Sequence, residues 1–393
     1  MIIKNHSQLR DFNVELIFRL IRKMGPVSRT TLSETTGLAP STVSVITSHL
    51  QDRGVIRERG RAVSTGGRRP VLLEVDPVGG YFITADLIGS HLSFGVVDLS
   101  LELTHMESLD EPSLEGEPLY AQLLRGFNQV ASHCEHKKCP ILGYGVATPG
   151  LIDSDGRVIE ADNLGWHGFD LQSKLAKDLS AMVVVQNDTN AAAFGEFQYG
   201  SLYENGWHNM LFVSVDTGVG TGLVLNGSLF RGARGLAGEF GHVTIDPNGL
   251  TCACGRQGCL ETIASAPAMV REYQRRGGDF KGAQPTFEEL VANVHLGDPT
   301  AVTVIQEAAK MTGIAISNQI NMLNVDVVIL GGAVIRKSDL FFQTASAYAK
   351  RTLPGLAEGL AIQKSLLGPQ AGLVGIASLS IDQLFSAPTE VRS

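Results

Sequence analysis

The chain has 393 residues, of which 44% are hydrophobic and 18% charged, so it can bury sizeable cores in more than one domain. No apolar run reaches about 18 residues and no charged-then-apolar leader is seen, so neither a membrane span nor secretion is indicated and we expect a cytoplasmic protein. Residues 1–75 carry 12 Lys and Arg against 6 Asp and Glu, a net +6, whereas the remainder has a net charge of −14. A basic head on an acidic body predicts a polyanionic partner for the head alone.

Residues 28–50 have the pattern of a helix-turn-helix, preceded by a helix predicted over residues 8–24. Gly37 permits the turn, and Pro40 suits the first turn of the second helix. Apolar residues at helical spacing predict the buried face of that helix: Val43, Ile46 and Leu50. Such a hairpin also serves as a plain packing unit, but the positive charge of the head favours binding of an operator in double-stranded DNA.

The outward face of the second helix carries short hydroxyl side chains, which can reach base edges or phosphates in a major groove. They are Ser41, Thr42 and Ser44, with Thr47 as a further candidate. Residues 54–75 then predict a β-hairpin wing with a glycine-rich tip. Its candidate DNA contacts are Arg57, Arg59, Arg68 and Arg69. Arginines at the tip fit a narrow minor groove, and a solvated basic loop that contacts only phosphates is an equal alternative.

Residues 242–259 place four soft metal ligands in one loop. His242 is followed at intervals typical of zinc sites by three cysteines, Cys252, Cys254 and Cys259. Four protein ligands leave no open position for an activated water, so the predicted Zn²⁺ is structural. Disulfides are the alternative, but Cys252 and Cys254 are too close to pair easily, and a disulfide leaves His242 unexplained. Glu239 and Glu261 flank the loop, so the metal would fix two carboxylates beside it.

The run Gly-Glu-Phe-Gly-His at 238–242, followed by Cys-x-Cys-Gly-x-x-Gly-Cys-Leu-Glu at 252–261, resembles the signature of the ROK family of sugar kinases and repressors. The similarity extends over nearly the whole chain, and the front end resembles the Mlc, NagC and XylR type of bacterial repressor. The resemblance implies an α/β chain with a winged helix-turn-helix over residues 1–75. Over residues 76–393 it implies a two-lobed ROK domain with an actin-like ATPase (ribonuclease H-like) fold that contains the zinc loop 242–259.

A sugar site is expected where loops gather at the cleft between the two lobes, because amides and carboxylates can engage vicinal hydroxyl groups. The candidates are Asn163, Asn187, Asp188, Glu239, His242 and Glu261. By resemblance, Asp188 matches the carboxylate that acts as general base in the kinases. An alternative role for Asp188 is to cap the helix predicted over 188–197. His242 can bind zinc through one ring nitrogen and leave the other for a sugar hydroxyl.

Two glycine hairpins bear on kinase activity. In kinases of this superfamily the first reads Asp-x-Gly-Gly-Thr, whereas here Ile88 replaces the first glycine and Ser90 the threonine, which opposes phosphate binding. The second, over residues 216–222, is better preserved and is equally consistent with plain architecture. We therefore predict a non-enzymatic transcriptional regulator, a repressor released by a sugar or sugar phosphate and acting as a homo-oligomer (dimer or tetramer). The alternative is an active ATP-dependent sugar kinase with a DNA-binding head, in which Asp188 is catalytic.

Overall fold

The computed structural model describes residues 6–61, 69–88, 91–110, 115–136, 140–199, 205–280, 282 and 285–386. The chain divides into two compact units. Unit 1 contains residues 1–148, 161–186 and 376–393, and unit 2 contains residues 149–160 and 187–375. Among the described helices, none has both the length and the apolar composition needed to cross a membrane.

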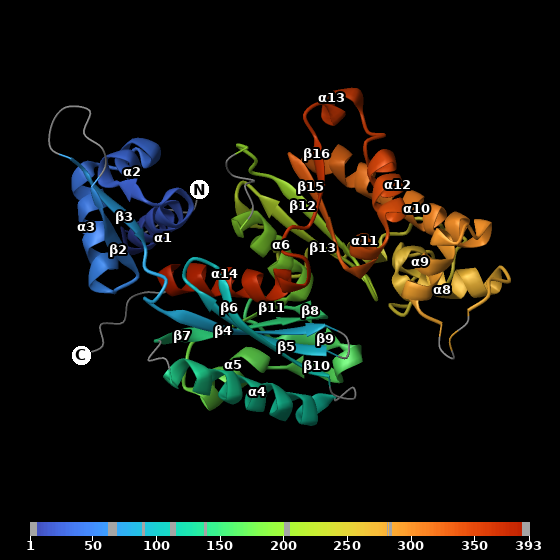
Figure 1. The fold of residues 1–393 in the computed structure, drawn as a ribbon, viewed down its shortest axis with the longest axis horizontal. Coiled ribbons are helices and arrows are strands. Elements are labelled where there is room, and N and C mark those ends of the chain that lie inside the picture. The colour runs from blue at the N-terminus through green and yellow to red at the C-terminus, as the bar shows by residue number, and fades with distance from the viewer. Residues whose placement is uncertain are drawn as a thin grey trace. The chain divides into compact units, whose positions relative to one another are not determined.

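The head of unit 1 is a winged helix-turn-helix (Figure 1). Its helices are α1 (His6–Met24), α2 (Arg29–Thr36) and α3 (Pro40–Asp52), and its strands are β1 (Val27–Ser28), β2 (Ile56–Arg61) and β3 (Val71–Val75). Gly37 adopts φ 70° and donates its N–H to the Ser33 carbonyl, so the predicted glycine turn is confirmed. Val43, Ile46 and Leu50 are buried, as the helical spacing predicted. The wing strands pair antiparallel, and β1 extends their sheet beyond β3.

The rest of unit 1 is built on a five-stranded sheet in the order β11-β7-β4-β5-β6. Its strands are β4 (Tyr81–Ile88), β5 (His91–Asp98), β6 (Leu103–Asp110), β7 (Ile141–Thr148) and β11 (Val183–Asn187). Helices α4 (Gly116–His136) and α5 (Leu171–Leu179) lie on one face and α14 (Ala371–Ser386) on the other (Figure 1). Neighbouring residues of β7 therefore face different helices. Tyr144 packs against Phe127 of α4 at a centroid distance of 5.2 Å, and Gly145 makes room for Ile376 of α14.

Unit 2 repeats this pattern with the strand order β14-β13-β12-β15-β16. Each sheet contains an antiparallel hairpin, β4 with β5 in unit 1 and β12 with β13 in unit 2. A later strand pairs parallel with the first strand of each hairpin, β7 with β4 and β15 with β12. The strands are β12 (Met210–Val215), β13 (Val219–Leu225), β14 (Ser228–Leu229), β15 (Val327–Gly331) and β16 (Ala361–Lys364). The main helices are α6 (Asp188–Tyr199), α7 (Glu261–Ala264), α8 (Ala266–Arg275), α9 (Phe287–His295), α10 (Pro299–Leu323), α11 (Ala333–Lys337), α12 (Asp339–Ala349) and α13 (Pro354–Ala357). Aliphatic side chains from β12, β15 and α10 dominate the core.

The end of α14 packs against the head within unit 1. The rings of Phe18 on α1 and Phe385 on α14 lie 4.5 Å apart, and the guanidinium of Arg53 stacks 5.1 Å from the same Phe385 ring. Arg19 Nη2 lies 3.0 Å from Asp382 Oδ2. Phe18 and Phe385 are buried by this contact, so removal of the head would expose apolar surface on α14.

Candidate functional site

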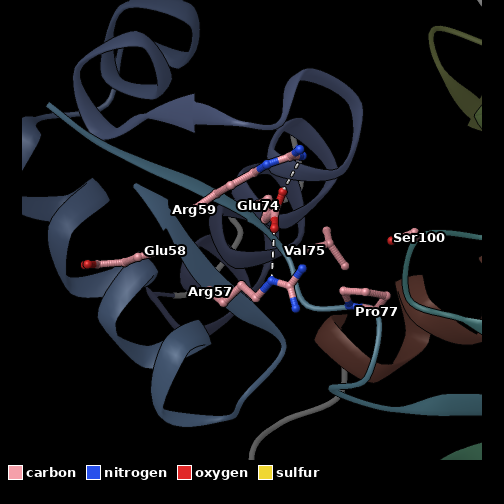
Figure 2. Close-up of a pocket in the computed structure, with 7 residues that line it drawn as sticks. All are labelled: Arg57, Glu58, Arg59, Glu74, Val75, Pro77 and Ser100. Carbon is pink, nitrogen blue, oxygen red and sulfur yellow. Dashed lines mark hydrogen bonds and ion pairs between the residues drawn. The ribbon is translucent and has the colours of Figure 1, made fainter. Parts of the chain in front are cut away.

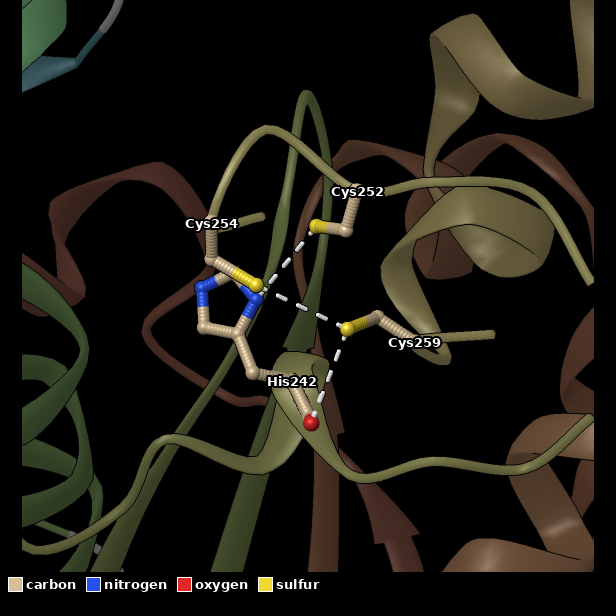
Figure 3. A group of neighbouring side chains, drawn as sticks. All are labelled: His242, Cys252, Cys254 and Cys259. Carbon is tan, nitrogen blue, oxygen red and sulfur yellow. Dashed lines mark hydrogen bonds between the residues drawn. The ribbon is translucent and has the colours of Figure 1, made fainter. Parts of the chain in front are cut away.

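His242, Cys252, Cys254 and Cys259 converge in unit 2 as a group that could hold a metal ion (Figure 3). One ligand atom from each residue lies within 4.8 Å of all the others. His242 ends the short 3₁₀ turn η2 (Phe240–His242), and Cys259 lies just before α7. The predicted ligand set is therefore brought together in space, and the sequence spacing alone sufficed to find it.

The separations between ligand atoms fit a tetrahedral dication. Around a zinc with Zn–S of about 2.3 Å and Zn–N of about 2.0 Å, the S···S and S···N separations are about 3.8 and 3.5 Å. Here Cys254 Sγ and Cys259 Sγ lie 3.7 Å apart, and Cys252 Sγ lies 3.6 Å from His242 Nδ1. Burial raises the pKa of the Cys259 thiol to about 12, so a cation is needed to hold it as a thiolate at neutral pH.

The loop around the cluster depends on Gly258, which lies beside Cys259. Gly258 adopts φ 73°, and a Cβ placed there would lie 1.6 Å from the carbonyl oxygen of Asp246. The N–H groups of Ile245 and Asp246 both donate to the Gly258 carbonyl. No residue with a side chain fits this crossing of two backbone segments, so glycine is required for the loop to close.

Three carboxylates gather beside the cluster within unit 2. His242 directs Nδ1 toward the sulfur atoms, while its Nε2 lies 4.0 Å from Glu239 Oε2. Partial burial raises the pKa of Glu239, and the nearby charges of Glu261 and Asp188 raise it further against the opposing effect of His242. Glu261 begins α7 and accepts the N–H of Val219 through Oε2 at 3.2 Å. His242 therefore belongs to the Cys/His cluster through Nδ1 and lies beside the candidate sugar ligand Glu239 through Nε2.

Asp188 is held in this group by helix α6, which packs closely against β13. Side chains at Gly220 and Gly222 would collide with Thr189 and Ala193 of α6, so these glycines serve the approach of the helix. Burial raises the pKa of Asp188, with a further contribution from Asp216, whereas hydrogen bonds from Thr189 lower it. A carboxyl group of raised pKa beside two others is suited to share protons and hydrogen bonds with hydroxyl groups.

The two asparagine candidates differ from the acidic ones. Asn187 Oδ1 accepts the N–H of Asn190 at the start of α6, and its Nδ2 donates to the Gly150 carbonyl at 3.2 Å. The capping role considered for Asp188 therefore belongs to Asn187, because Asn187 precedes the first turn. Asn163 is exposed in the short turn η1 (Asp162–Leu164) and belongs to unit 1.

The outward face of α3 differs in one residue from the expected one. Ser41 and Ser44 are exposed and Thr42 is half-buried, but Thr47 is fully buried and accepts a 2.8 Å hydrogen bond from Arg29 Nε. Thr47 was therefore wrong as a candidate DNA contact, because its side chain points into the junction of α2 and α3. Sequence reasoning missed two exposed residues, Val45 and Ser48, although the i, i+4, i+7 spacing from Ser41 places them on the same helical face.

Two wing arginines are engaged with acidic side chains. Arg57 Nε and Arg59 Nη1 each lie 2.9 Å from an oxygen of Glu74, and together they line a pocket with Pro77 and Ser100 (Figure 2). Although burial acts in the opposite direction, the hydrogen bonds from these arginines hold the pKa of Glu74 below its usual range. Their side chains remain 48% and 62% exposed, so their outer faces can still meet phosphates.

The other predicted wing contacts are Arg68 and Arg69. Arg69 is exposed, and Arg68 lies outside the described residues. In the first glycine hairpin, Ile88 ends β4 and pairs with His91, and Ser90 also lies outside the described residues. The second hairpin is closed by Asp216, whose Oδ1 accepts from the Thr217 N–H and Oδ2 from the Ala333 N–H.

Several known proteins are similar to this chain. The xylose repressor of Bacillus subtilis is 30% identical over 99% of this chain and 100% of its own length. A crystal structure of a ROK family transcriptional regulator, a homologue of the E. coli MLC protein, matches with a TM-score of 0.83 and 28% identity over 96% of this chain and 97% of the other. A ROK family glucokinase from Streptomyces griseus, in complex with glucose and AMPPNP, matches with a TM-score of 0.66 and 29% identity, over 76% of this chain and 99% of the kinase.

These matches confirm the predicted fold class, an α/β chain whose body has the actin-like fold of the ROK kinases and regulators. The family model described as "ROK family" matches residues 83–383, which include the Cys/His cluster and both five-stranded sheets except the first two residues of β4. The chain therefore belongs to the ROK family.

Proposed function

We propose that this protein is a sugar-responsive transcriptional repressor, in which the head binds an operator and the body binds the sugar that releases it. The observation that carries the proposal is the winged helix-turn-helix joined to a ROK body. The xylose repressor matches that combination from end to end, whereas the glucokinase matches 76% of the chain.

Operator binding is assigned to the basic head. Its net charge of +6 attracts the DNA backbone, while the acidic remainder of the chain does not. Helix α3 enters the major groove with Ser41, Thr42 and Ser44 near its N-terminus, as recognition helices do. Arg57, Arg59, Arg68 and Arg69 of the wing contact phosphates or the adjacent minor groove.

Sugar binding is assigned to the carboxylates beside the Cys/His cluster. Asp188, Glu239 and Glu261 offer acceptors for hydroxyl hydrogens, and Nε2 of His242 adds a further polar contact. Asn187 is added to the proposed set, where it acts mainly by capping the start of α6, and Asn163 of unit 1 stays a candidate from the sequence alone. Because several relatives are named xylose repressors, D-xylose is the first sugar to test.

Zinc is the metal that best suits one imidazole and three thiolates, with His242, Cys252, Cys254 and Cys259 as its ligands. When bound, it closes the loop and supplies no catalytic position. His242 and the two flanking residues Glu239 and Glu261 are thereby held in one orientation, which reduces the entropy lost when a sugar binds.

Release of DNA requires that the sugar bind the released form more tightly than the DNA-bound form. We propose a dimer or tetramer, because helix-turn-helix proteins meet two half-sites about one helical turn apart. A sugar that changes the separation of two heads in such an oligomer lowers operator affinity without any change in α3 itself.

The test uses the full-length protein. DNA duplexes that bind the protein are selected from a library with a randomised central sequence. The affinity for the selected duplex is measured at several salt concentrations, and each sugar of a panel is then added to the complex. We expect an enriched duplex, a steep loss of affinity with salt, and release by at least one sugar or sugar phosphate. Selection that enriches no duplex would refute the repressor assignment. Deletion of residues 1–75 is a weaker test, because it exposes Phe385 on α14.

A second candidate, an ATP-dependent sugar kinase, is favoured by the raised pKa of Asp188 and by the match to a glucokinase. It is opposed by Ile88 and Ser90 in the first hairpin. A coupled ATPase assay over the same sugar panel separates the two: sugar phosphorylation by the wild type that is lost in Asp188→Asn would establish the kinase.

A further inference from the structure

The outward face of α3 has an apolar centre. Ser41, Val45 and Ser48 recur at i, i+4 and i+7 and are all exposed. The Val45 side chain is 66% exposed, more than any other large apolar side chain in the described part of the head. Its exposed neighbours at i−4 and i+3, Ser41 and Ser48, are small and leave its two methyl groups open to a surface that the helix approaches, whereas His49 at i+4 is half-buried.

The first three turns of this face contain no long hydrogen-bonding side chain, and the polar residues His49 and Asp52 follow only in the last turn of α3. Arg29, which lies beside α3, donates instead to Thr47 and Gln51 within the head. Gln51 Oε1 is thereby engaged, and Arg53 stacks on Phe385. The bidentate contacts by which Arg, Asn or Gln distinguish bases are therefore not offered by the described outward face of α3.

Helix stability does not account for a valine at this position. β-branched residues lose side-chain freedom in a helix, and alanine is the more favourable residue at an exposed helical site. Val45 packs no core, since the buried face of α3 is formed by Val43, Ile46 and Leu50. Replacement of Val45 by alanine should therefore leave the head at least as stable as before.

We propose that Val45 is a specificity-determining residue of the head, which contacts the 5-methyl group of a thymine in the major groove of each half-site. The inference rests on the proposed DNA-binding function. The thymine methyl is the apolar group that the major groove presents, and the small, uncharged neighbours Ser41 and Ser48 let Val45 approach it closely. One buried methyl corresponds to about a fourfold change in affinity per half-site.

The test starts from the duplex that the full-length protein enriches from a random-centre library. Each thymine is replaced in turn by deoxyuridine, which removes only the 5-methyl group, and the Kd is measured for the wild type and for Val45→Ala. We expect one thymine in each half-site at which deoxyuridine weakens wild-type binding about fourfold. The Val45→Ala variant should bind duplexes with thymine or deoxyuridine at that position equally well. The difference between wild type and variant then isolates the contact between Val45 and the thymine methyl group.

The matched control is Val78→Ala, because Val78 is 62% exposed and lies outside the head. It should keep the full wild-type discrimination between thymine and deoxyuridine. The inference is overturned if Val45→Ala also keeps that discrimination, or if no deoxyuridine substitution affects wild-type binding. Both results leave the repressor assignment intact, whereas failure to enrich any duplex removes the assignment and the inference together.

Discussion

Helix α3 of the head and the Cys/His loop of the body are both short exposed segments to which function is assigned, but they are held in place differently. Helix α3 is fixed by its buried apolar face and by hydrogen bonds from Arg29. The loop from 243 to 260, all of it described, contains no helix or strand and is joined by the isolated bridges Thr244↔Cys259 and Thr251↔Gln257 and by backbone hydrogen bonds such as those to the Gly258 carbonyl. The outward residues of α3 can therefore change without loss of structure, whereas the ligands of the loop cannot.

The largest effect is expected from Cys259→Ser, which removes a buried ligand of the proposed zinc site. Stoichiometric zinc should be lost and the free energy of unfolding of unit 2 should fall by about 3 kcal/mol or more, because metal binding and loop folding are coupled. Elemental analysis and thermal unfolding measure both. Thr251→Ala, in the same loop but not a ligand, is the control. Wild-type protein purified without zinc would contradict the proposed metal.

Asp188→Asn tests whether the body uses charge to bind sugar. The amide keeps an acceptor and a similar shape but loses charge assistance, so sugar affinity should fall by about 1.5–3 kcal/mol while operator affinity and zinc content are retained. Calorimetry with the releasing sugar measures the loss. Asp155→Asn, which removes an exposed carboxylate from unit 2, should have no such effect. Unchanged sugar affinity in Asp188→Asn would exclude Asp188 from the site.

Arg29→Met tests how α3 is held in the head. The substitution removes the hydrogen bonds to Thr47 and Gln51, so the head should lose about 1–2 kcal/mol of stability and operator affinity should fall with it. Arg10→Met, at an exposed position of α1, is the control: it removes one positive charge from the head but keeps the hydrogen bonds of Arg29. Equal losses in the two variants would mean that charge, and not the position of α3, decides operator affinity.

The smallest effect concerns pH. Burial raises the pKa of Asp188 above the value of about 3.9 expected in the unfolded chain, so ionisation of Asp188 destabilises the folded protein at neutral pH. Ligand-free Asp188→Asn should therefore be more stable than wild type at pH 7. The difference should shrink as the pH falls through the raised pKa and be lost near pH 4. Denaturant unfolding at several pH values measures it, and a difference that grows toward acid would contradict this cause.

Much of the candidate site could be predicted from the sequence because its signals are local. The spacing of His242 and the three cysteines places four ligands in one loop, and the period of Val43, Ile46 and Leu50 identifies the buried face of α3. The role of Thr47 could not be predicted in this way. Its side chain lies at the junction of two helices, and only the packing of α2 on α3 decides that it faces Arg29.

The sequence by itself determined the winged head, the alternating α/β body and the Cys/His cluster, because periodicity, turn residues and the spacing of cysteine and histidine act over a few residues. Tertiary structure alone decided which arginines are paired, since Arg57 and Arg59 meet Glu74 across the wing. It also decided that Gly220 and Gly222 allow α6 to pack closely on β13, and that Nε2 of His242 faces Glu239. Such contacts join segments far apart in sequence or depend on side-chain rotamers, which no local pattern specifies.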